Sequence, residues 1–217
     1  PIMSVLAKIC GITDESAMRA AVINGANFVG LVFHPPSPRS LDAMSASRLV
    51  SLVPPSITKV GLFVNPINNQ LNSVLNDVSL DLIQLHGEET PERCNEIRKI
   101  FGLPVMKVIK VSNIYDIEGV SDYYEAVDWL MFDAKAPDSM DNALPGGNAL
   151  KFDWNLLAGR NWSLPWMLAG GLNAENVGTA VAESGAMIVD VSSGVESSPG
   201  EKDPLEIERF MQAVLSL

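Results

Sequence analysis

The apolar positions of this chain fall into short runs that alternate with longer segments of helical period. The runs are rich in Val, Ile, Leu and Phe and have few polar interruptions, as expected for strands buried on both faces. They predict eight strands, over Val5–Cys10, Phe28–Phe33, Lys59–Val64, Leu80–His86, Val105–Ile109, Trp129–Asp133, Trp166–Ala169 and Met187–Val191.

A segment of helical period follows each run. Thr13 or Asp14 provides a capping residue before the first helix, and Thr90 followed by Pro91 marks the start of the fourth. The expected helices are Glu15–Asn24, Ser45–Val53, Asn68–Val78, Pro91–Phe101, Ile114–Tyr124, Trp154–Ala158, Ala174–Ser184 and Pro204–Leu215.

Eight strand–helix units predict an α/β fold of the (βα)8 TIM-barrel type. An open doubly wound sheet would usually have fewer strands and a glycine-rich turn after the first strand, which Cys10–Thr13 does not supply. We find no internal repeat and no linker, so residues 1–217 are expected to form a single domain.

Two connections are much longer than the others: His34–Ala43 after the second strand and Ala134–Asp153 after the sixth. Both are rich in Pro, Gly, Ser and Asp. On a barrel they would lie at the carboxyl ends of the strands, where active sites are built.

Polar residues useful for proton transfer and anion binding gather at these strand ends, whereas the strand interiors are apolar. A concentration of this kind indicates a functional site. The residues are Cys10, His34, Asn65, His86, Lys110, Asp133, Gly170, Gly171, Ser192, Ser193 and Gly194.

Charge narrows the range of ligands. The chain has 15 Lys and Arg against 26 Asp and Glu, a formal net charge of -11. This excess argues against nucleic acid and against an anionic membrane surface as partners, but it leaves room for a small anion held by backbone N–H groups. No apolar stretch is long enough for a membrane span, and we find no signal peptide, so a cytoplasmic location is expected.

Cysteine and histidine are scarce, at two residues each. Two cysteines do not make a disulfide scaffold, and no zinc-type spacing is present, so we expect no metal. Cys94 is placed on the outward side of its helix, as a structural residue or a spectator.

The run Lys8–Thr13 resembles the opening of the phosphoribosylanthranilate isomerase family of tryptophan biosynthesis, and five further blocks follow in the family's order. They are Gln84–Gly87, Phe132–Ala134, Gly146–Gly147 with Phe152–Trp154, Leu168–Leu172, and Asp190–Glu196 with Pro199–Gly200 and Lys202–Asp203. The resemblance implies a barrel of the ribulose-phosphate-binding type, without cofactor or metal, acting on a phosphosugar as a monomer or homodimer.

The family's reaction is an Amadori rearrangement of N-(5'-phosphoribosyl)anthranilate to 1-(2-carboxyphenylamino)-1-deoxyribulose 5-phosphate. By resemblance, Cys10 is the general base, Asp133 the general acid, and Arg39 the group that holds the anthranilate carboxylate. One departure is visible: the family usually has a third glycine two residues after the Gly-Gly pair, and here Asn148–Leu150 fills that stretch. The resemblance therefore does not extend to the backbone contacts of this stretch.

The chemistry agrees with this assignment. Opening an aminofuranose requires a proton at the ring oxygen, after which a modest base can remove the C2' proton. The pair needs a thiolate and a protonated carboxyl, although free Cys titrates near 8.5 and free Asp near 3.9, so the site has to offset both values. The alternative for Cys10 is a small buried hydrophobe, and the alternative for Asp133 is a helix cap or a salt-bridge partner.

The remaining candidates follow from position at the strand ends. We expect phosphate on backbone N–H groups of the last two turns, unless their glycines only make tight turns. His86 and Asp190 are candidate substrate contacts. The alternative for His86 is a hydrogen bond within the rim, and the alternative for Asp190 is a cap on the eighth loop. The alternative for Arg39 is a solvated loop residue that does not bind the carboxylate. The phosphate-binding candidates are Gly147, Gly170, Gly171, Ser192, Ser193 and Gly194.

Two alternatives stay open. The related histidine-pathway isomerase family performs the same rearrangement on another phosphoribosyl adduct, but it looks internally duplicated and has an aspartate where Cys10 stands. A phosphate-binding barrel without catalysis, acting as a sensor, is the other. The presence of both Cys10 and Asp133 speaks against it.

Overall fold

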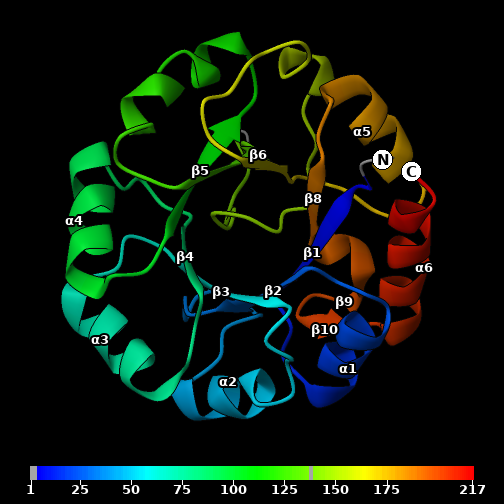
Figure 1. Ribbon diagram of the computed structural model, residues 1–217. Helices are drawn as coiled ribbons and strands as arrows, with labels where there is room; N and C mark the ends of the chain where they lie inside the picture. Colours follow the sequence, from blue (N-terminus) through cyan, green and yellow to red (C-terminus); the bar gives the residue numbers. More distant parts are fainter. Residues whose placement is uncertain (1–3, 137–138) are drawn as a thin grey trace.

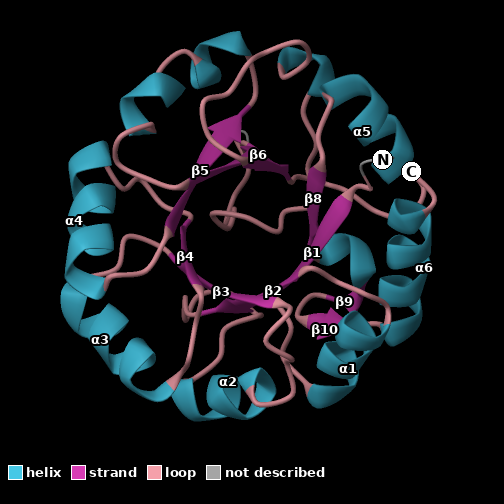
Figure 2. Cartoon of the chain, in the orientation of Figure 1, coloured by secondary structure: helices cyan, strands magenta, loops and turns pink. Residues whose placement is uncertain are grey.

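The computed structural model describes residues 4–136 and 139–217. Its eight parallel strands close into a barrel in chain order, and β1 pairs with both β2 and β8. Figure 1 views the barrel along its axis, with the strands forming an inner ring and the helices outside it. Figure 2 shows the same arrangement coloured by secondary structure. The strands are β1 Leu6–Cys10, β2 Phe28–Val32, β3 Thr58–Phe63, β4 Leu82–Leu85, β5 Val105–Val111, β6 Trp129–Ala134, β7 Trp166–Leu168 and β8 Ile188–Val191.

The α-helices cover the outside of the barrel. Helices α1 and α4 begin as predicted, where the side chains of Asp14 and Thr90 accept backbone N–H groups of the first turns. Helix α2 begins two residues earlier than predicted, because the Asp42 side chain accepts the N–H of Ser45. The helices are α1 Glu15–Ile23, α2 Ala43–Val50, α3 Asn68–Asp77, α4 Pro91–Phe101, α5 Val177–Ser184 and α6 Pro204–Leu215. A short hairpin of β9 (Glu196–Ser198) and β10 (Glu201–Lys202) precedes α6.

The (βα)8 prediction is confirmed, and α6 has its predicted bounds, but the other helices of the second half are shorter than predicted. The expected helix over 114–124 is two 3-10 helices, η1 (Ile114–Ile117) and η2 (Val120–Tyr123), separated near Gly119. The expected helix over 154–158 is one 3-10 turn, η3 (Trp154–Leu156), and a further turn, η4 (Ser193–Val195), follows β8.

Further boundary errors have local causes. Helix α5 begins three residues later than predicted because the Asn173 side chain accepts the N–H groups of Glu175 and Asn176 in a turn that precedes it.

The predicted outward placement of Cys94 is wrong, since Cys94 is fully buried together with Ile97 on the inner face of α4.

Two apolar layers stabilise the fold. The larger one fills the space between strands and helices, and a smaller one fills the barrel interior. The interior layer is built from alternate, inward-facing strand residues: Phe28, Val60, Leu82, Met106, Val108, Met131, Met167 and Ala169. This layer fills the barrel interior beneath the cleft. The polar residues at the carboxyl ends of the strands continue the same inward-facing positions above it.

Candidate active site

A cleft with about 780 Å³ of open space lies at the carboxyl ends of the strands. Strand residues and the segments after β2, β6, β7 and β8 line it, and a loop following β6 reaches into the centre of the ring in Figure 1. The cleft brings together Cys10, Arg39, His86, Asp133, Gly147, Gly170, Gly171, Asp190, Ser192 and Ser193.

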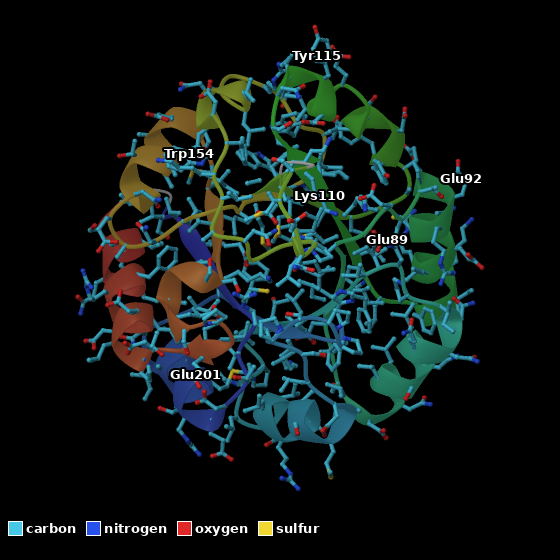
Figure 3. The ribbon with its side chains drawn as sticks, turned by 180° about the vertical axis from the view of Figure 1, so that it is seen from behind. Glu89, Glu92, Lys110, Tyr115, Trp154 and Glu201 are labelled. Carbon is cyan, nitrogen blue, oxygen red and sulfur yellow. The ribbon has the colours of Figure 1, made fainter. Side chains whose placement is uncertain are left out.

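Other residues named from the sequence lie in different surroundings. His34 lines the cleft, whereas, among the described residues, Asn65 and Lys110 are not part of its lining. Lys110, labelled in Figure 3, lies within β5. Its Nζ lies 3.2 Å from Oε1 of Glu88. Gly194 is also outside the lining, and a Cβ there would collide with the carbonyl oxygen of Leu172, so its lack of a side chain lets the turns after β7 and β8 meet.

Asp133 is held by neutral hydrogen-bond donors. The backbone N–H of Ala134 donates to Oδ1 at 2.9 Å, and Nε2 of His86 lies 3.0 Å from Oδ2. On the far side of the ring, Gln84 Nε2 donates to His86 Nδ1 at 3.0 Å. With the Gln84 amide in this orientation, Nδ1 accepts and the imidazole proton on Nε2 faces Asp133.

Cys10 lies among charged groups. Lys8, two residues earlier on β1, faces the same barrel interior, and its Nζ is 2.8 Å from Oδ1 of Asp190 on β8. Burial raises the pKa of the Cys10 thiol, while the Lys8 ammonium acts in the opposite direction.

Arg39 is not a solvated loop residue, because only 5% of its surface is exposed. Its Nε and Nη2 donate to the two carboxylate oxygens of Glu196 at 2.8 and 2.7 Å, a bidentate pair. Lys202 donates to the same carboxylate at 2.7 Å and to the carbonyl oxygen of Ser192 at 2.9 Å. The hairpin therefore ties the segment after β2 to the turn after β8.

The segment after β6 covers the cleft, and at two glycines only backbone fits. A Cβ on Gly146 would lie 2.5 Å from His86 Nε2, and one on Gly147 would collide with the guanidinium of Arg39. The Asn148 side chain pairs with both backbone groups of Leu144 and closes the loop. Ala149, where the family usually has glycine, adopts φ 56, a left-handed conformation that L side chains disfavour. Positions 137–138, in the same segment, lie outside the described residues.

The turns after β7 and β8 meet on one side of the cleft. Gly170 and Gly171 have φ values of 96 and 65, which favour glycine, and Ser192 and Ser193 face the same space. The two turns therefore border the same part of the cleft.

Four side chains around the site have no role in the interpretation of the sequence: Lys8, Gln84, Glu196 and Lys202. Strand alternation is the signal that identifies two of them. Lys8 lies two residues before Cys10 and Gln84 two residues before His86, so each shares the interior line of a site residue.

The described residues contain neither a metal-type cluster nor a membrane-spanning helix. Within residues 4–136 and 139–217, no three His, Cys, Asp or Glu side chains cluster as a metal site. In these ranges, none of the helices has both the length and the apolar character needed to span a membrane.

Comparisons with known proteins agree on one family. The family model of N-(5'phosphoribosyl)anthranilate (PRA) isomerase matches residues 7–213. The N-(5'-phosphoribosyl)anthranilate isomerase of Paramagnetospirillum magneticum is 56% identical over 211 residues, covering 97% of each chain. That of Rhodospirillum centenum is 52% identical over 215 residues, covering 99% of this chain and 100% of the relative.

Solved structures of the same family superpose over the whole barrel. Phosphoribosyl anthranilate isomerase from Thermotoga maritima gives a TM-score of 0.87 at 38% identity, covering 98% of this chain and 100% of that one. A family structure in complex with reduced 1-(o-carboxyphenylamino)-1-deoxyribulose 5-phosphate gives a TM-score of 0.82 at 35% identity with the same coverage.

Proposed function

Because the chain belongs to the N-(5'-phosphoribosyl)anthranilate (PRA) isomerase family, we propose that its cleft performs the family's rearrangement with Cys10 as general base and Asp133 as general acid. The protein is an isomerase of tryptophan biosynthesis. The observation that carries the assignment is that the thiol of β1 and the carboxyl of β6 line one cleft on a closed barrel.

The proposed reaction begins at the ring. Asp133 gives its proton to the furanose oxygen as the C1'–O bond breaks, which leaves an iminium. The Cys10 thiolate then takes the C2' proton, and the electron pair of that bond forms the C1'=C2' double bond of an enaminol. Its tautomerisation places a proton on C1' and frees the C2' carbonyl. The proton on Cys10 returns to Asp133 through solvent.

Substrate groups other than the sugar are assigned by charge. Arg39 uses two N–H groups on Glu196 and keeps further donors for the anthranilate carboxylate. Asp190 lies at the cleft for a sugar hydroxyl, and His86 orients Asp133. The phosphate would bind between Gly171 and Ser193, near the ammonium of Lys202 that supports Ser192.

The wider organisation of the protein is also proposed. Residues 1–217 would form one domain that acts in the cytoplasm on a small phosphosugar, without nucleic acid. A Thermotoga maritima relative is described as dimeric, which favours a homodimer over a monomer for this chain.

The direct test is a turnover assay. Supplied with N-(5'-phosphoribosyl)anthranilate, the protein should remove the substrate's fluorescence at a rate that scales with enzyme concentration. The phosphoribosyl adduct of the histidine pathway is the comparison substrate. Preferential turnover of that adduct, or binding of inorganic phosphate without turnover of either, would reject the assignment.

A further inference from the structure

Lys8 is a buried cation for which the reaction described above has no use. Its side chain has no exposed surface and is the largest of the fully buried ones. An ammonium group loses its hydration at such a position, so it is retained only where negative charge compensates it. The compensating groups therefore indicate what Lys8 does.

Asp190 is the first compensating group. The β1–β8 register places Lys8 opposite Asp190, and the ion pair measures 2.8 Å. This contact fixes the position of Nζ inside the barrel. Asp190 Oδ1 is the one hydrogen-bond acceptor of Nζ among the described residues, so the ammonium has donors left for another group.

The Cys10 sulfur is the second group that compensates the charge of Lys8. A Cβ built on Gly30 of β2 would lie 2.8 Å from Cys10 Sγ and 3.1 Å from Lys8 Nζ, so both atoms press on the same glycine from the barrel interior. The thiol and the ammonium are therefore within the roughly 4–6 Å range in which a positive charge stabilises a neighbouring anion. A Cβ at Gly30 would force the sulfur to shift.

Charge on this side of the cleft is unbalanced. Lys8 pairs with Asp190, whereas Arg39 and Lys202 share the single carboxylate of Glu196. Three cations thus face two carboxylates, and a thiolate at Cys10 would restore neutrality. The titratable and charged groups that face Cys10 across the cleft are Lys8, Asp190, Lys202, Arg39, His34, His86 and Asp133.

The pKa values follow this geometry. Burial acts to lower the pKa of Lys8, yet Asp190 and Cys10 outweigh burial and raise it, so the amine stays charged. Burial raises the pKa of the Cys10 thiol, with Lys8 the largest opposing influence, followed by Asp190, which adds to the rise. Lys8 and Asp190 therefore act on Cys10 with opposite signs.

We propose that Lys8 is a positioning residue for the general base, and that its ammonium group, held by Asp190, stabilises the Cys10 thiolate inside the barrel. The inference rests on the proposed function for its catalytic meaning. The thiol chemistry itself is independent of substrate. The reactivity of Cys10 in the free enzyme therefore reports directly on Lys8.

The experiment is the pH dependence of iodoacetamide alkylation at Cys10, followed by mass spectrometry of the Cys10 peptide, beside kcat measured over the same pH range. Lys8→Met should move the thiol profile up by at least one pH unit and slow alkylation at neutral pH about tenfold, with kcat falling in parallel. Asp190→Asn should move the alkylation profile down. Cys94 is fully buried with its pKa raised to about 12, so it leaves the readout clear.

Lys107→Met is the matched control. Lys107 is buried and pairs with Glu89 at 2.7 Å, but it contacts Tyr123 and Gly87 rather than the cleft. Figure 3 shows Glu89 inside the ring of helices, whereas Glu92 lies toward its outer side. This variant should lose stability and keep the Cys10 profile.

If Lys8→Met does not fold, the double variant Lys8→Met/Asp190→Asn, which leaves no unpaired charge from the pair, carries the test. Its thiol should still alkylate more slowly than the parent's at neutral pH. An unchanged profile in the folded variant, or shifts of the same sign for Lys8→Met and Asp190→Asn, would overturn the proposal. A parent enzyme with no isomerase activity but a Lys8-dependent profile would reject the proposed function alone.

Discussion

The two sides of the cleft differ in how they treat charge. The base side, formed by Lys8, Cys10, Arg39, Asp190, Glu196 and Lys202, is a network of ion pairs with one excess positive charge. On the acid side, formed by Gln84, His86 and Asp133, the hydrogen bonds come from an amide, an imidazole and a backbone N–H. No lysine or arginine hydrogen-bonds to the acid side within the described ranges.

The difference separates the surroundings of the base from those of the acid. Cations next to a thiol favour the thiolate, while neutral donors orient a carboxyl without providing the full charge that would stabilise its anion. The two environments are kept apart by the width of the barrel, since Cys10 and Asp133 lie on β1 and β6. The base and the acid thus differ in their partners: ion pairs surround Cys10, and neutral donors hold Asp133.

The largest expected effect comes from removing either reacting group. Cys10→Ser and Asp133→Asn should each lower kcat by about 10²–10⁴-fold with little change in KM, because both groups act in the transition state. Steady-state kinetics of both variants, with circular dichroism to show that they fold, is the measurement. A Cys10→Ser enzyme with near-normal kcat would remove the base side from the mechanism.

Removing the shared carboxylate tests the network next. Glu196→Gln leaves two buried cations without their anion and should destabilise the fold by about 3 kcal/mol or more at pH 7. Burial opposes the charge of Glu196, but Arg39 and Lys202 outweigh burial and lower its pKa. A depressed pKa contributes stability above the unfolded value of about 4.3 that disappears as pH falls through the folded value, so the gap between parent and variant should close in acid.

Urea unfolding at several pH values measures this gap. Glu201→Gln is the control, because Glu201 is exposed on the same hairpin (Figure 3) and should change stability by less than about 0.5 kcal/mol. A Glu196 gap that stays constant from pH 7 to pH 3 would contradict the prediction.

A smaller effect is expected when one cation leaves the base side. Arg39→Met should raise KM for the anthranilate adduct, since it removes a charge-assisted contact worth roughly 1.5–3 kcal/mol, and should lower kcat less than Lys8→Met does. The diagnostic is KM against kcat. If both are unchanged, Arg39 serves only to hold Glu196.

The smallest effect concerns the loop that spans the two sides. Gly146 covers His86 and Gly147 covers Arg39, while Ala149 carries the strained φ of 56. Ala149→Gly should relieve this strain and raise the free energy of unfolding by about 0.5–1 kcal/mol. Ala143→Gly in the same loop, where φ is not positive, should bring no gain. Equal effects in urea unfolding would show that the loop carries no strain.

The sequence predicted the strands to within two residues at nearly every end, because a strand buried on both faces is apolar throughout. It failed at η1, η2 and η3, since apolar spacing does not distinguish a 3-10 turn from a short α-helix. The lining residues followed from strand ends and the family resemblance. Lys8 and Gln84 did not, because they sit inside strands whose other residues are apolar, and the partner of Lys8 is 182 positions away in the sequence.

The closure of the barrel through β1 and β8 sets the order in which the protein becomes reactive. Lys8 and Asp190 are 182 positions apart, so at about 5–20 residues per second the ribosome makes Asp190 roughly 10–40 seconds after Lys8. Throughout that interval the nascent chain has no anion on β8 to accompany the lysine into an interior, and Lys8 stays in water. The emerging polypeptide therefore carries an ordinary cysteine, and the thiol gains its ammonium neighbour only after β8 has been made and has paired with β1.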